Sequence, residues 1–182
     1  MFESTDLVTA EELARLPDDG YRYELVEGRL IRMSPVSFDH GRIVMQLGAR
    51  LHNHLRHFPS GVVVTDVGFT LASNPDTVRG PDIAFIKNER VPSRGKRGFF
   101  KGAPDLVIEV LSPEDRPGET RDKIEGYLVR GVPLVVVIDP HDQTATVFRP
   151  AAASVTLGSE SAFLDLSDVI PGFSCQLREI FQ

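Results

Sequence analysis

The chain has 182 residues, 41% of them hydrophobic and 25% charged, with a formal net charge of −6. The length and composition predict one globular domain over residues 1–182. The negative net charge counts against a protein that binds many phosphates of a nucleic acid. A single cysteine excludes an internal disulfide, and the longest apolar runs are too short to span a bilayer. The amino-terminal residues also lack the pattern of a signal peptide, so we expect a cytoplasmic protein with no membrane partner.

The first hundred residues predict a mixture of short helices and strands. Thr9 is a helix cap followed by two acids, and residues 21–26 and 29–33 alternate around Glu27-Gly28 as in a hairpin. Asp39 is expected to cap a helix that runs to about residue 57, because its apolar residues recur at helical spacing. Strands are expected at 61–66, 68–72 and 80–86, and a loop at 88–103.

The second half predicts a strand, a helix and further strands in turn. The strand covers residues 104–112, and the helix covers about 118–130 and ends at Gly131. Residues 132–138 and 144–148 form a pair of strands around a polar turn. Short strands are expected at 155–157 and 163–166, and a last helical turn at 177–181.

Two of these strands carry an acid inside an apolar, β-branched run. Asp82 follows Pro81 at the start of one strand, and Glu109 lies between Ile108 and Val110 in the other. An ionised carboxylate in such surroundings is costly unless it is paired or binds a metal, and two hard carboxylates suit Mg²⁺ or Mn²⁺. Two ordinary structural roles remain open. Asp82 would then accept bonds from backbone amides, and Glu109 would form a buried salt bridge with Arg121 or Lys123.

These strands and the residues around them resemble the PD-(D/E)XK nuclease superfamily, and more closely its Uma-two family of bacterial putative restriction endonucleases. The similarity covers most of the chain and lies in residues 23–30, Ser34-Pro35, His40, 81–83, 104–113, Lys123 with Tyr127, Gly131-Val132 and 137–140. It implies an α/β (α+β) fold with a mixed, curved β-sheet flanked by α-helices. It also implies a metal-dependent endonuclease that hydrolyses phosphodiester bonds of DNA, with Asp82 and Glu109 as metal ligands.

The chain departs from the superfamily pattern at one position. The pattern places a lysine two residues after the glutamate, where this chain has Leu111. In the Uma-two family the lysine is found on the following helix, so the resemblance implies Lys123 as the catalytic cation. Glu24 is a candidate third carboxylate, and His40 is a candidate to contact a phosphate or activate water. Asp105 shares a strand face with Glu109, but we expect a structural role for it.

The basic residues cluster between the two acid-bearing strands. Residues 87–101 contain six basic side chains against Glu89, a net charge of +5, so the remaining residues carry −11. Such a segment beside a metal site suits DNA binding, although a solvated loop has the same composition. Duplex cleavage favours a homodimer, with residues 132–138 and 144–148 and the C-terminal segment as candidate interface.

Two other functions remain open. The chain is alternatively a catalytically inactive module that keeps the nuclease fold for nucleic-acid binding or assembly, as Leu111 and the negative charge suggest. It is alternatively an enzyme that acts on a smaller phosphoester, such as a nucleotide.

Overall fold

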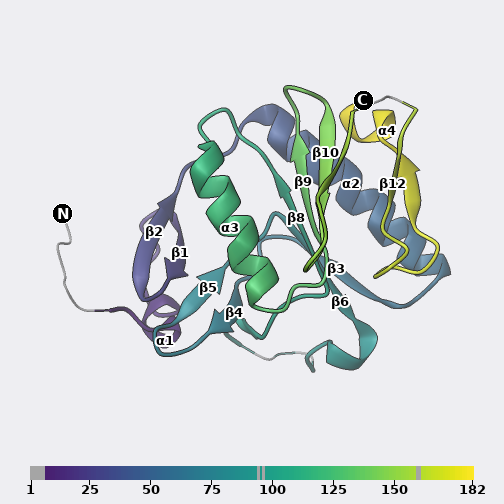
Figure 1. Ribbon diagram of the computed structural model, residues 1–182. Helices are drawn as coiled ribbons and strands as arrows, with labels where there is room; N and C mark the ends of the chain where they lie inside the picture. Colours follow the sequence, from purple (N-terminus) through teal and green to yellow (C-terminus); the bar gives the residue numbers. More distant parts are fainter. Residues whose placement is uncertain (1–6, 94, 96, 159–160) are drawn as a thin grey trace. The chain divides into compact units, whose positions relative to one another are not determined.

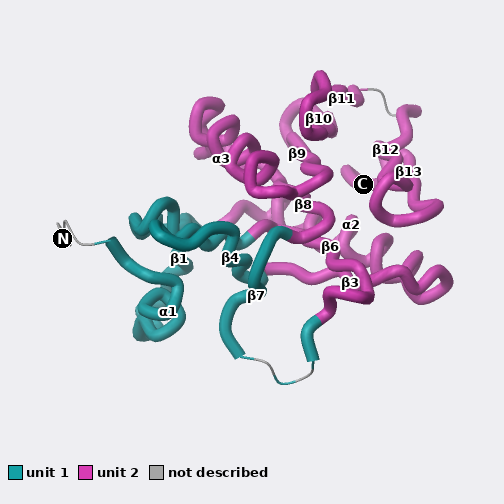
Figure 2. Tube along the Cα trace, turned by 60° about the horizontal axis from the view of Figure 1, so that its bottom comes forward, with its two compact units in different colours: residues 1–35, 67–80, 92–103 teal, residues 36–66, 81–91, 104–182 magenta. Residues whose placement is uncertain are grey.

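The computed structural model describes residues 7–93, 95, 97–158 and 161–182. The chain forms two compact units, each assembled from segments distant in sequence, which Figure 2 colours separately. The first unit comprises residues 1–35, 67–80 and 92–103, and the second comprises residues 36–66, 81–91 and 104–182. The expectation of a single domain remains a prediction.

The first unit begins with the predicted short helix and hairpin (Figure 1). Helix α1 (Ala10–Leu13) is capped by Thr9, whose side chain accepts the Glu12 amide while the Glu12 carboxylate accepts the Thr9 amide. Strands β1 (Arg22–Val26) and β2 (Arg29–Met33) pair antiparallel. Glu27 and Gly28 between them have φ of 50° and 76°, as a two-residue hairpin turn requires. The sequence prediction for this region is confirmed.

A five-stranded sheet in the order β2-β1-β5-β4-β7 forms the body of the first unit. It adds β4 (Phe69–Ala72), β5 (Thr77–Arg79) and β7 (Phe100–Lys101) to the hairpin. Strands β5 and β7 were not predicted, because three and two residues are too few to show an alternating pattern. Leu13, Leu25 and Val78 form the buried centre of this unit.

The second unit contains a six-stranded mixed sheet in the order β11-β10-β9-β8-β6-β3. Strand β6 runs antiparallel to β8, and β8 runs parallel to β9. The strands are β3 (Gly61–Val64), β6 (Ile83–Lys87), β8 (Leu106–Val110), β9 (Val135–Asp139), β10 (Thr144–Phe148) and β11 (Val155–Leu157). A separate pair, β12 (Phe163–Asp165) and β13 (Ser174–Gln176), follows. Together with the helices, these sheets confirm the expected α+β class.

Two helices cover opposite faces of the six-stranded sheet (Figure 1). Helix α2 (Phe38–His57) buries Ile43, Leu47, Leu51 and Leu55 against one face. Helix α3 (Pro117–Val129) forms the crossover between β8 and β9, because parallel strands need a long connection between them. It buries Ile124 and Tyr127. A single turn, η1 (Asn88–Arg90), follows β6, and α4 (Arg178–Phe181) ends the chain.

The cap of α2 differs from the sequence prediction. Ser37 is the N-cap and its side chain accepts the His40 amide, whereas Asp39 lies in the first helical turn. A hydroxyl such as that of Ser37 is a good N-cap, and an acid such as Asp39 is favoured in the first turn by the helix dipole. The prediction that Asp39 caps the helix is therefore wrong by two residues.

The strands proposed as a dimer interface lie in the core of the second unit. Val136 and Ile138 of β9, and Ala145 and Val147 of β10, belong to one buried cluster with α2. Packing within one chain explains the apolar character of these strands. The homodimer therefore remains a prediction, and these segments no longer support it. No helix among the described residues is long and apolar enough to cross a membrane.

Candidate active site

The two strand-borne acids meet at one place in the six-stranded sheet. The register pairs Ile83 of β6 with Ile108 of β8, and continued by one residue it sets Asp82, which immediately precedes β6, opposite Glu109. Opposed positions on antiparallel strands point to the same face. Asp82 also bridges the strands, because its Oδ2 accepts the Val110 amide at 2.7 Å. The predicted pairing of acids from adjacent strands is thus observed. Asp82 also accepts the hydrogen bond from a backbone amide that a purely structural aspartate would accept.

Helix α3 supplies partners to both oxygens of Glu109. The Tyr127 hydroxyl donates to Oε1 at 2.7 Å, and the Lys123 Nζ lies 2.9 Å from Oε2. Lys123 and Tyr127 are four residues apart and share one helix face. Glu109 itself is only 8% exposed. Lys123, the lysine that the resemblance implies as the catalytic cation, therefore forms an ion pair with the strand-borne glutamate.

His40 approaches the same acids from α2. Its Nε2 lies 3.1 Å from Asp82 Oδ2, while its buried Nδ1 has no hydrogen-bond partner among the described residues. The Ser37 cap places His40 in the first turn of the helix, where its side chain is almost fully buried. Four of the five predicted site residues, His40, Asp82, Glu109 and Lys123, are thus brought together within the second unit.

The charge of this cluster shows in the pKa of His40. Burial on its own lowers that pKa, but the hydrogen bond to Asp82 and the negative charges of Asp82, Glu109 and Asp115 outweigh burial. The net result is a pKa raised above the ordinary histidine value. The site therefore favours a positive charge on the side chain that faces Asp82.

Glu24, the fifth predicted residue, belongs to the first unit and has fixed partners there. Its Oε2 accepts from Arg79 Nη1 at 2.6 Å, and its Oε1 accepts the Gly80 amide at 2.9 Å. The side chain is 4% exposed. Both oxygens are therefore engaged by the strand and turn that lead along the chain to Asp82.

Asp105 has the structural position that was expected. Its Oδ2 accepts the Lys87 amide at 3.0 Å and lies 3.0 Å from Arg90 Nη1. These contacts join the start of β8 to η1 at the end of β6. Arg90 and Lys87 open the basic segment, of which Arg94 and Lys96 lie outside the described residues.

The donors in this cluster suit a hard divalent ion in kind. Among the described residues no group of three or more His, Cys, Asp or Glu side chains is placed to hold a metal. Two carboxylates from neighbouring strands are, however, what Mg²⁺ commonly takes from a protein, since it keeps several waters. A zinc site takes three or four protein ligands, mostly histidine nitrogen or cysteine sulfur, and the described residues gather no such set here. Asp82 and Glu109 are the residues that could hold such an ion.

Two residues that contact or surround the cluster, Asp115 and Tyr127, were not among the predicted site residues. Asp115 adds negative charge near His40, and the Tyr127 hydroxyl binds Glu109. The four-residue spacing of Lys123 and Tyr127 was a usable signal, because it places both side chains on one helix face. Asp115 carries no such signal, since it lies in a turn after β8 whose path only the fold defines.

The fold resembles that of a solved protein. A crystal structure of a putative nuclease belonging to DUF820, from Anabaena variabilis ATCC 29413, superposes with a TM-score of 0.83 at 21% identity. The match covers 96% of this chain and 97% of the other, so the likeness extends over the whole fold. No curated protein matches the chain. The model of the Uma2 family, described as "Putative restriction endonuclease", matches residues 10–178, and the chain therefore belongs to that family.

Proposed function

We propose that this protein is a divalent-metal-dependent endodeoxyribonuclease that hydrolyses phosphodiester bonds of DNA, with Mg²⁺ or Mn²⁺ held by Asp82 and Glu109. The observation that carries the proposal is the convergence of two acids, a lysine and a histidine at one point of the six-stranded sheet. Membership of the Uma2 family supports the same reaction class.

The chemistry of the donors agrees with this assignment. Asp82 and Glu109 offer oxygens from adjacent strands, which is the ligand type that Mg²⁺ and Mn²⁺ prefer. A bound divalent ion supplies neutralisation of phosphate charge and a water of lowered pKa. Burial of Glu109 to 8% exposure keeps solvent from competing with these interactions.

Lys123 supplies a fixed positive charge beside the acids. Its ammonium lies 2.9 Å from Glu109 and its side chain is 19% exposed. An ammonium in a partly dry site stabilises negative charge that develops on a transferring phosphoryl group. This is the role that the missing lysine at position 111 would otherwise have.

His40 and Glu24 assist in different ways. His40 Nε2 lies 3.1 Å from Asp82 Oδ2, and this contact orients the Asp82 carboxylate. Glu24 accepts from Arg79 and from the Gly80 amide within the first unit, two residues before Asp82 in the chain. In this proposal Glu24 holds that part of the backbone and does not hold the ion.

DNA is the substrate that the charge distribution supports best. The segment from Lys87 to Lys101 carries +5 in a chain of −6 and starts at the last residue of β6, the strand that Asp82 precedes. Phosphate contacts from such a segment depend on salt concentration. Cutting both strands of a duplex further requires two sites, which a homodimer would provide.

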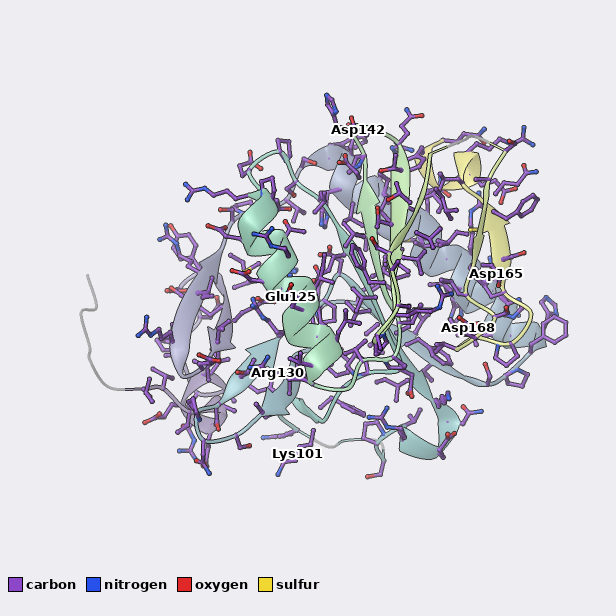
Figure 3. The ribbon with its side chains drawn as sticks, in the orientation of Figure 1. Lys101, Glu125, Arg130, Asp142, Asp165 and Asp168 are labelled. Atoms are coloured by element: carbon purple, nitrogen blue, oxygen red, sulfur yellow. The ribbon has the colours of Figure 1, made fainter. Side chains whose placement is uncertain are left out.

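The test is a cleavage assay on supercoiled plasmid and single-stranded DNA, with Mg²⁺, Mn²⁺ or a chelator. We expect nicking that depends on the metal and is abolished by Asp82→Asn. The matched control is Asp168→Asn, because Asp168 is an aspartate paired with Arg149 at 2.7 Å, in the turn between β12 and β13 (Figure 3). The control variant is expected to cleave like the wild type.

The inactive-module alternative predicts a different result. A wild-type protein that leaves both substrates intact with either metal contradicts the proposed hydrolysis. Calorimetry with Mn²⁺ then separates a protein that binds the ion without cleaving DNA from a module that does not bind the ion. Competition of plasmid cleavage by nucleotides tests the second alternative, a smaller phosphoester as substrate.

A further inference from the structure

Tyr127 is fully buried, yet it carries a polar group into the candidate site. Its exposed fraction is 0%, and its hydroxyl donates to Glu109 Oε1 at 2.7 Å in a buried bond. A phenylalanine would fill nearly the same volume without a polar atom to satisfy. The hydroxyl therefore requires an explanation beyond packing, and its partner is a proposed metal ligand.

The carboxylate of Glu109 needs more than one bond to have a defined plane. The terminal torsion of a glutamate is broad, so a single contact leaves the carboxylate able to rotate. Lys123 holds Oε2 at 2.9 Å, but the lysine is a point charge on a flexible four-carbon side chain. Tyr127 has few rotatable bonds and is enclosed on all sides, so its hydroxyl gives Oε1 a rigid partner.

We propose that Tyr127 is a positioning residue that fixes the plane of the Glu109 carboxylate for divalent-ion binding. This inference rests on the proposed metal-dependent function. Tyr127 and Lys123, one turn apart on α3, hold one oxygen each, so the orientation of the glutamate is set by a single helix face. Bonds of this kind behind a metal ligand typically contribute 10- to 100-fold to affinity or activity.

The decisive variant is Tyr127→Phe, which removes one oxygen and keeps the buried ring. Its matched control is Tyr23→Phe, because the Tyr23 hydroxyl on β1 of the first unit also donates to a carboxylate, Asp19 Oδ2, at 2.7 Å, in an exposed hydrogen bond. We expect Tyr127→Phe to weaken Mn²⁺ binding about 10- to 100-fold by calorimetry. We expect Tyr23→Phe to bind Mn²⁺ like the wild type.

A second measurement does not depend on metal or activity. In crystal structures of both variants, we expect the Glu109 carboxylate to leave its 2.9 Å contact with Lys123 only in Tyr127→Phe. A merely structural role would lower the urea midpoint but leave the Glu109 conformation and the Mn²⁺ affinity of the folded protein unchanged, and this overturns the inference. If the wild type binds no Mn²⁺, the proposed function fails, while an unmoved or moved Glu109 still decides the positioning role.

Discussion

The two ends of β8 carry similar acids with different surroundings. Asp105 and Glu109 are four residues apart on the same face of the chain, and they are 7% and 8% exposed. Each has a cation about 3 Å away, Arg90 for Asp105 and Lys123 for Glu109. By burial and pairing alone the two ends are nearly equivalent.

The difference lies in what else is present. Asp105 meets one backbone amide and an arginine whose side chain is 36% exposed, so its charge is balanced by a simple pair. Glu109 faces a second acid, Asp82, which in turn holds His40. Several ionisable groups gathered away from water are costly for folding and typical of functional sites. A single ion pair, in contrast, often has a structural role. The comparison teaches that clustering, and not burial, separates the two acids.

The sharpest test of this comparison removes the charge at each end of β8. We expect Glu109→Gln to lower cleavage more than about 10³-fold, beyond the loss of one charge-stabilising donor, because metal affinity and activity fall together. Asp105→Asn is expected to cleave within a few-fold of the wild type. Glu125→Gln is the control for the same substitution at an exposed glutamate, because Glu125 lies on the exposed side of α3 (Figure 3). Equal losses at both ends would remove the distinction.

Lys123 gives the next largest effect. Lys123→Ala is expected to lose about 10²–10³ in rate while it still binds Mn²⁺, since the ammonium acts on developing charge and is not a ligand. Lys123→Arg should rescue incompletely, because a planar guanidinium does not replace a compact ammonium. Single-turnover cleavage and calorimetry separate the two effects. A wild-type rate for Lys123→Ala would transfer the catalytic role to the cations of residues 87–101.

The Asp105 end should respond in stability and not in rate. Asp105→Ala leaves the Lys87 amide without its acceptor and Arg90 without its partner. We expect a loss of about 1–3 kcal/mol in the free energy of unfolding, the cost of stranding a buried partner. Urea denaturation with and without Mn²⁺ measures it. A variant as stable as the wild type would mean that Asp105 does not fasten η1 to β8.

Cys175 offers the smallest effect and a check on all the others. It lies on β13 in the core cluster that includes Leu106 and Ile108 of β8, and burial raises the pKa of its thiol to about 11. At pH 8 only about one thiol in a thousand is then ionised. Labelling with a disulfide reagent should be slow and should rise with pH beyond 9. Fast labelling in Glu109→Gln would show an opened core instead of a lost ligand.

Local features were predictable because their physical causes are local. The Thr9 cap, the turn at Glu27-Gly28 and the end of α3 just before Gly131 each depend on a few neighbouring residues. Strands of two or three residues, such as β5 and β7, were missed because no pattern fits in so few positions. Ser37 and Asp39 both suit a helix start, so the sequence could not decide between them.

For the site, the sequence by itself determined which residues carry unusual charge: acids inside the apolar strands at 82 and 109, and a lysine and tyrosine one turn apart on the next helix. The tertiary structure alone decided which of these meet. Strand register sets Asp82 across from Glu109, and the path of α3 brings Lys123 and Tyr127 onto that pair. It also gave Glu24 an arginine partner. Pairing across a sheet depends on contacts between residues far apart in the chain, and no local pattern encodes them.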